Sequence, residues 1–174
     1  MNLYFRLFLL LFRLIGLPRR GLFEESRIVF RVLPTDCDVN FHMNNGRYLS
    51  FMDLGRVHLV AQIGLLGLVV KNRWMPVLAA AEINFIRQLA PFQKFDLVTR
   101  LVTWDDKYAY MEQRFEAGGA LCAHAFVKGL FLAGGDRVKN AELVAALGYT
   151  GAPPSMPEEL RLWVELGSVK KQNA

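Results

Sequence analysis

The chain has 174 residues, of which 53% are hydrophobic and 21% charged, a composition that excludes a disordered polypeptide and predicts one domain with a full core. The net charge of +5 comes largely from arginines in the first 27 residues, and the near-neutral middle argues against a nucleic-acid groove. Two cysteines, Cys37 and Cys122, have neither a disulfide framework nor a metal-binding spacing. We therefore expect free thiols, no metal, no cofactor and a cytoplasmic protein.

Residues 1–20 form an apolar, aromatic segment with interspersed arginines, and Gly16 and Pro18 would end a helix there. Its longest charge-free run, Leu7 to Phe12, is far shorter than the about 20 apolar residues that span a bilayer. Three interpretations remain: an amphipathic helix at a membrane interface, a helix docked on its own domain or a partner subunit, and a processed or spanning segment. The first predicts that a chain lacking residues 1–20 keeps an active core and loses liposome binding.

Residues 26–33 are predicted to form a strand, which Pro34 ends, and a dense polar segment follows. Within ten residues this segment contains two carboxylates, three carboxamides and an imidazole: Asp36, Asp38, Asn40, His42, Asn44 and Asn45. Polar groups crowded against apolar flanks are costly unless they are paired, and such clusters often perform chemistry. The segment is therefore the candidate site.

The remaining elements predict an α+β fold. Residues 46–64 read as a long, largely buried helix, and strand-like runs follow at 76–87, 95–104, 108–116 and 120–132. One strand, one long helix and four consecutive strands suit an antiparallel sheet wrapped around the helix. Residues 138–167 predict two short helices separated by a Gly- and Pro-containing stretch at 151–154. The expected organisation is an N-terminal helix (1–20), a core domain (26–133) and a C-terminal helical extension (134–174).

The polar segment resembles the D-x-D-x-x-G-H-V-N-N-x-x-Y block of hotdog-fold acyl-CoA thioesterases. It is still more similar to the D-x-D-V-N-x-H-V-N-N block of plant acyl-carrier-protein thioesterases. The resemblance covers residues 26–133 and implies a hotdog fold, an antiparallel sheet wrapped around one long central helix. It also implies hydrolysis of acyl-CoA or acyl-ACP by a homodimer or homotetramer. A non-catalytic hotdog-fold protein that binds lipid at a membrane surface is the alternative.

The resemblance also implies roles for individual residues. Asp38 takes the place of the catalytic carboxylate, as general base or nucleophile, with Asn40 and His42 as its partners. Backbone amides at the start of the long helix, around Gly46, are the candidate oxyanion hole, because helix N-termini favour negative charge. The substrate-binding candidates are Phe41, Asn45, Gly46 and Tyr48. Phe41 departs from the first block, which has glycine there, so its ring is expected to narrow the approach of substrate or to line an acyl pocket.

Several polar residues have simpler structural explanations. Asp36 is expected to brace the turn, and Asn44 and Asn45 to form the turn and cap the helix. His58 and His124 are expected to be satisfied histidines in the core or at an interface. Cys37 is an unsuitable nucleophile, because flanking carboxylates raise the pKa of its thiol.

Overall fold

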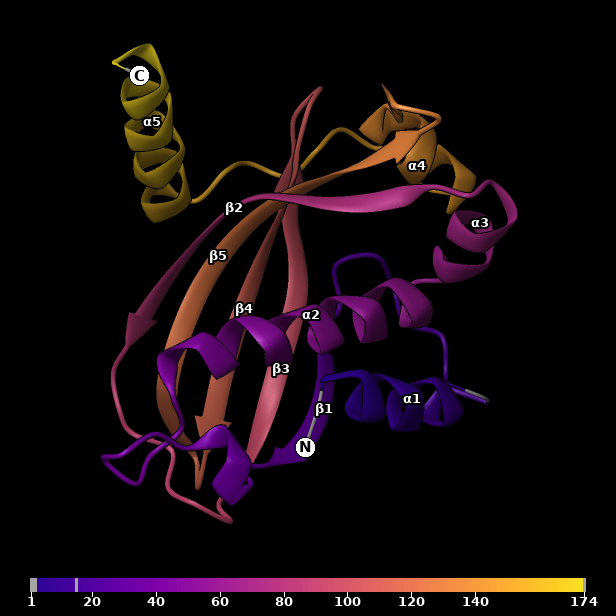
Figure 1. Ribbon diagram of the computed structural model, residues 1–174. Coiled ribbons are helices and arrows are strands. Elements are labelled where there is room, and N and C mark those ends of the chain that lie inside the picture. Colours follow the sequence, from indigo (N-terminus) through magenta and orange to yellow (C-terminus); the bar gives the residue numbers. More distant parts are fainter. Residues whose placement is uncertain (1–2, 15, 174) are drawn as a thin grey trace.

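The computed structural model describes residues 3–14 and 16–173 and consists of a curled antiparallel sheet wrapped around a long helix (Figure 1). In this described part, five long strands follow the order β1-β3-β4-β5-β2, and a short sixth strand pairs with β5. The strands are β1 (Ser26–Arg31), β2 (Met75–Phe85), β3 (Lys94–Trp104), β4 (Ala109–Ala117), β5 (Ala120–Ala133) and β6 (Asp136–Arg137). The helices are α1 (Leu3–Arg13), α2 (Asn45–Gln62), α3 (Leu66–Lys71), α4 (Asn140–Ala146) and α5 (Glu158–Gln172). The α+β hotdog prediction is confirmed.

The central helix α2 lies close to the sheet because Gly55, on its buried face, has no side chain. A Cβ atom at Gly55 would lie 2.7 Å from side-chain atoms of both Leu97 and Thr99 on β3. Large apolar side chains on the same helix, including Phe51 and Met52, are buried against the sheet. Each such side chain contributes about 1.5–3 kcal/mol when it is removed from water. This packing fixes α2 and, with it, the polar segment that precedes its first residue.

The five long strands and α2 have bounds within two residues of those expected. The short helix α3 was not predicted, because six residues that include a glycine are too few to show a helical period. Helix α5 runs on to Gln172, beyond the expected end at residue 167. Lys170 and Lys171 in its last turn suit the negative end of the helix dipole, which favours this extension.

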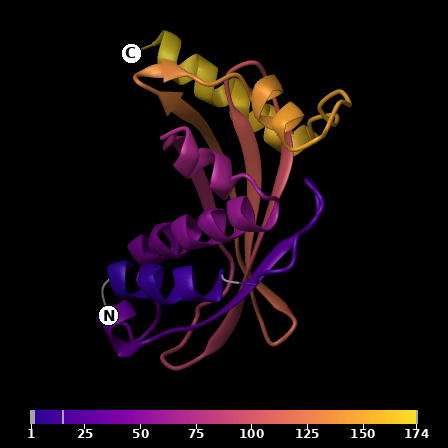
Figure 2. The same cartoon turned by 90° about the vertical axis from the view of Figure 1, so that its right-hand side faces the viewer.

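Helix α1 lies beside α2 and packs against the domain with one face (Figure 2). Arg6 and Leu10 are 8% and 2% exposed, and the Arg6 guanidinium carbon lies 4.4 Å from the ring centroid of Phe51. The opposite face of α1 is exposed and carries Tyr4, Phe5, Phe8, Leu9, Leu11 and Phe12. The helix is thus docked on its own domain, with an apolar face left open.

The contacts of α1 bear on the expectation that a chain lacking residues 1–20 keeps an active core. Removing the segment would uncover Phe51 and leave the buried carboxylate of Asp36 without its partner Arg6. Every helix in the described part of the chain falls short of the length or the hydropathy that crossing a bilayer requires.

The two C-terminal helices cover different parts of the sheet. Helix α5 packs on the outer face, away from α2, where Leu160 is fully buried beside Phe126. Helix α4 lies near α3 at the end of the sheet far from the polar segment (Figure 1). Its Leu143 is buried in one cluster with Leu65 and Val138.

Candidate active site

The polar segment forms a tight turn, residues 38–42, directly before α2; we call it the polar turn. The N–H of Asp38 donates to the carbonyl of His42, and the N–H of Phe41 donates to the carbonyl of Asp38, both at 3.1 Å. Phe41 has a φ of 57°, in the left-handed region that glycine adopts without strain. This conformation explains why the acyl-CoA thioesterase block has a glycine at the position that Phe41 occupies here. The Phe41 ring is exposed at the tip of the turn.

The polar turn brings the side chains of Asp38 and His42 together. The Oδ2 atom of Asp38 lies 3.7 Å from Nδ1 of His42, and each side chain is 23% exposed. The other carboxylate oxygen accepts a hydrogen bond from the backbone N–H of Asn40 at 2.9 Å. One oxygen is therefore fixed by the turn, and the other faces the imidazole. Catalytic contacts that are long in a free enzyme commonly shorten when substrate binds.

A buried carboxylate, Asp36, anchors the polar turn to the rest of the domain. Its Oδ2 accepts from the N–H of Leu33 at 2.9 Å and forms an ion pair with Arg6, and its carbonyl accepts from the N–H of Asn44 at 2.9 Å. Arg47 approaches the other carboxylate oxygen to 3.7 Å. The bracing role expected for Asp36 is confirmed.

The contact of Arg6 with Asp36 was not predicted from the sequence. Burial lowers the pKa of the Arg6 guanidinium, and the charge of Asp36 opposes that shift. A signal was present in the sequence, because a cation that interrupts an apolar helix needs a buried anion if that face packs against the core. The identity of the anion could not be read from the sequence, because 30 positions separate the two residues.

The start of α2 is capped as expected. The Oδ1 atom of Asn44 accepts from the N–H of Gly46 at 2.9 Å. The amide of Gly46, a candidate oxyanion donor, is therefore occupied by the cap in this state. Asn45 and Gly46 are exposed beside the polar turn.

Tyr48 lies in the core, where its ring packs between the first turn of α2 and the sheet. Its ring centroid is 4.9 Å from that of Phe85 and 4.8 Å from that of Phe115. Burial raises the pKa of the Tyr48 hydroxyl to about 12. Of the four substrate-binding candidates, the three others are exposed around the polar turn, and Tyr48 packs beneath them.

Two further candidates have the structural roles expected of them. Burial raises the pKa of Cys37, and Asp36 and Asp38 raise it further, so its thiolate is disfavoured. His58 is buried with its Nδ1 2.7 Å from Oγ of Ser26, and burial lowers its pKa. Among the residues that the structure describes, no group of three His, Cys, Asp or Glu side chains could hold a metal ion.

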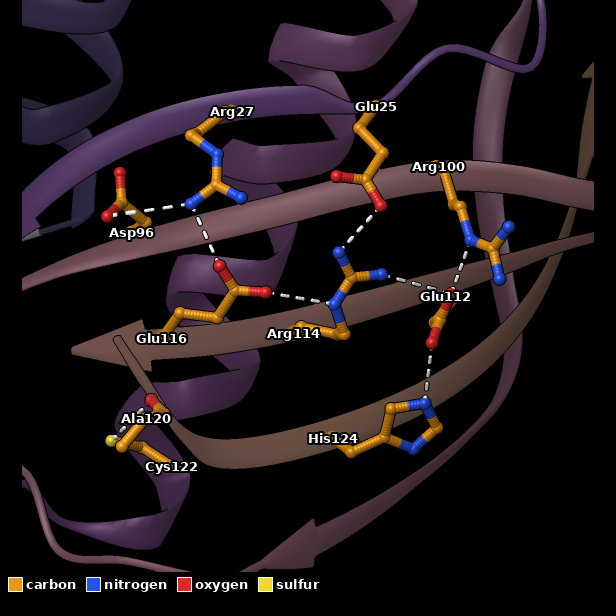
Figure 3. A network of polar contacts seen from close by, with 10 residues as sticks. All are labelled: Glu25, Arg27, Asp96, Arg100, Glu112, Arg114, Glu116, Ala120, Cys122 and His124. Carbon is orange, nitrogen blue, oxygen red and sulfur yellow. Dashed lines mark hydrogen bonds and ion pairs between the residues drawn. The ribbon is translucent and has the colours of Figure 1, made fainter. Parts of the chain in front are cut away.

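A network of charged side chains covers the outer face of the sheet (Figure 3). At its centre Glu112 pairs with Arg100 and, at 3.4 Å, with Arg114, and Nε2 of His124 lies 2.8 Å from its other oxygen. The hydrogen bond with His124 and the two arginines lower the pKa of Glu112 to about 2. The network continues through Glu25, Arg27, Asp96 and Glu116. His124 is thus satisfied in an ion-pair network that joins neighbouring strands.

An apolar cavity of about 370 Å³ lies along the C-terminal half of α2, with walls from α2, α3, α4 and the inner face of the sheet. Polar side chains on its wall are already paired. Arg56 pairs with Asp53 and donates to Gln113 at 2.9 Å, and Asn140 donates to the carbonyl of Asp105 at 2.8 Å. Burial lowers the pKa of Arg56. The cavity therefore offers a ligand mainly hydrocarbon surface.

Together these features define a hotdog-fold protein with a carboxylate–imidazole pair before its central helix. Residues 32–164 match the sequence model of the thioesterase-like superfamily. The chain belongs to this family.

Individual proteins agree with the family assignment. The chain is 29% identical over 135 residues to a probable thioesterase of Saccharomyces cerevisiae, covering 75% of this chain and 57% of that protein, so it spans little more than half of that relative. It is 32% identical over 156 residues to Protein THEM6 of Xenopus laevis, covering 88% and 73% of the two chains. The solved structure of a gentisyl-coenzyme A thioesterase shares the fold with a TM-score of 0.60 at 19% identity, covering 68% and 97%.

Proposed function

We propose that this protein is an acyl-thioester hydrolase that cleaves acyl-CoA to a free acid and a thiol, with acyl-ACP as the alternative substrate. The observation that carries the proposal is the pair formed by Asp38 and His42, partly exposed in a turn that Asp36 anchors before α2. The family of the chain supports thioester hydrolysis. Coenzyme A is the acyl carrier in the name of the gentisyl-coenzyme A thioesterase, which has the same fold.

In the proposed reaction Asp38 removes a proton from water, the resulting hydroxide adds to the thioester carbonyl, and the carbon–sulfur bond breaks as the thiol leaves with a proton. Direct attack by the Asp38 carboxylate is the alternative first step. His42 faces Asp38 and would orient the water or the substrate, as would the side chain of Asn40. The oxyanion would form near the start of α2, where the helix dipole favours negative charge. Because Asn44 holds the N–H of Gly46, that amide can act as a donor only after the Asn44 side chain rotates away.

The test is thiol release from acyl-CoA and acyl-ACP panels by the wild type, Asp38→Asn and the control Asp106→Asn, an exposed carboxylate in the β3–β4 turn. Asp38→Asn should lower kcat about a hundredfold or more, because general-base catalysis typically contributes that much. His42→Ala should have a smaller effect, and Asp106→Asn none. A folded Asp38→Asn variant with wild-type kcat would remove Asp38 from the mechanism. A wild type inactive on both panels would favour the lipid-binding alternative.

We infer further that the active unit is a homodimer or a pair of such dimers. Strand β2 ends the strand order of the described sheet, and its exposed side chains include Met75, Leu78 and Phe85. A long, apolar, unpaired edge readily pairs with another strand. Antiparallel pairing of two β2 strands would set the Phe85 end of one, which lies beside Tyr48, next to the Met75 end of the other.

We also propose that the open face of α1 contacts a membrane surface peripherally. Phe5, Phe8 and Phe12 are exposed there, with Arg13 at the end of the helix, the mixture that suits an anionic lipid interface. Phe8→Glu with Phe12→Glu should abolish co-sedimentation with anionic liposomes at low salt. Full-length protein that ignores such liposomes would reject this proposal.

A further inference from the structure

The cavity beside α2 is large, and one of its walls comes from a helix outside the hotdog core. Its volume of about 370 Å³ is more than twice the about 150 Å³ of an apolar cavity that holds benzene. A single aromatic ring would therefore leave most of it empty. It also lies within the range of about 300–1,000 Å³ typical of small-molecule sites.

Helix α4 supplies one wall of this cavity through Leu143, Val144 and Leu147. Another wall comes from α2, including Val57 and Val60. The helix belongs to the segment after β5, and the burial of Leu143 against Leu65 of the α2–α3 connection holds it over the cavity. The length of the cavity thus depends on the side chains that α4 presents.

We propose that this cavity binds the hydrocarbon chain of an aliphatic acyl group and that α4 sets the chain length it accepts. The proposal rests on the proposed thioesterase function and names the substrate class of the same site. The wall charges support hydrocarbon over a charged ligand, because Arg56 is already held by Asp53 and Gln113.

The position of the cavity determines which chains can reach it. Asp53, on the wall, lies about 12 Å along the axis of α2 from Asn45, at about 1.5 Å per residue. An acyl group whose carbonyl lies at a polar turn must therefore extend several methylenes before it enters. Pro76 and Leu78, also on the wall, belong to the end of β2 that would face the partner's polar turn in the proposed dimer. In this arrangement short acyl groups do not reach the cavity, whereas long acyl groups bury their terminal methylenes in it.

The first experiment compares kcat/KM on saturated acyl-CoAs from butanoyl to palmitoyl for the wild type, Val144→Trp and Ala145→Trp. Val144 lines the cavity, whereas its neighbour Ala145 is exposed, which makes Ala145→Trp a matched control. In the wild type each methylene that enters should raise kcat/KM about fourfold, the factor equivalent to about 0.8 kcal/mol per buried CH₂. Val144→Trp should lower kcat/KM for the longest chains at least tenfold and leave butanoyl-CoA unchanged. Ala145→Trp should retain the wild-type profile.

The second experiment measures binding without turnover, by displacement of the fluorescent fatty acid cis-parinaric acid with palmitate. The wild type and Ala145→Trp should bind equally, and Val144→Trp at least tenfold more weakly. If Val144→Trp fails to fold, Leu147→Trp, on the same wall, replaces it. Binding with this pattern but no hydrolysis would reject the thioesterase function and support the cavity proposal. Equal chain-length profiles and equal affinities for the wild type and the wall variant, or preference for benzoyl-CoA over palmitoyl-CoA, would overturn it.

Discussion

At the residue scale, the polar turn depends on the buried ion pair between Arg6 and Asp36. Replacing one partner of such a pair leaves an uncompensated buried charge, which typically costs about 3–5 kcal/mol. Arg6→Gln should therefore lower the free energy of unfolding by about 3 kcal/mol or more, measured by urea denaturation. Arg13→Gln, an exposed arginine on the same helix, should change it by about 0.5 kcal/mol or less.

The double variant Arg6→Met with Asp36→Leu separates charge from packing. It removes both charges of the pair together and should be more stable than Arg6→Gln, because no buried carboxylate is then left without Arg6. Equal stability of Arg6→Gln and the wild type would mean that α1 contributes nothing to holding the turn.

The sequence identified the residues of the polar turn but not their support. Asp38, Asn40 and His42 could be found because they lie in one short, unusual segment. Arg6 could not be assigned to the site, because its contact joins distant parts of the chain. The engagement of the Gly46 amide was also missed, because the same Asn44 cap that was expected competes with an oxyanion for that donor.

At the scale of the elements, the network on the outer face ties β3, β4 and β5 together through Glu112. The pKa of Glu112 in the folded protein is about 2, below the usual value for glutamate. The ionised Glu112 therefore stabilises the fold fully above pH 4.5, and this stabilisation is lost as the pH falls toward 2. Over that window the wild type should lose up to about 3 kcal/mol from this group. Glu112→Gln should be less stable at neutral pH and show a shallower loss in acid. Parallel acid profiles for the two proteins in urea denaturation would contradict this assignment.

The elements themselves were predictable where hydrophobic patterns were long. The strands and α2 extend over enough residues for a period to emerge, and the hairpin turns between β3, β4 and β5 are marked by charged or glycine residues. The position of α4 over the cavity was not predictable, because the sequence of a seven-residue helix does not indicate which surface the helix packs against. The same holds for α1, whose apolar residues outnumber those that one docked face can bury.

At the scale of the whole molecule, the open edge of β2 predicts self-association. Ala81→Arg places a long charged side chain on an exposed position of that edge and should shift the protein toward monomer, as measured by light scattering at micromolar concentration. Ala141→Arg, on an exposed position of α4, is the control and should leave the mass unchanged. A wild type that is monomeric with full activity would reject the dimer.

The contact between α1 and Asp36 makes the N-terminal helix and the polar turn thermodynamically linked. Arg6 can leave Asp36 only if α1 undocks, so a ligand that favours the undocked helix weakens any ligand that requires the anchored turn. Linkage makes the effect reciprocal: a substrate that tightens the turn must increase the docked fraction of α1 by the same factor. A ligand that binds only the undocked helix and a ligand that requires the anchored turn would therefore each lower the other's affinity by the same factor.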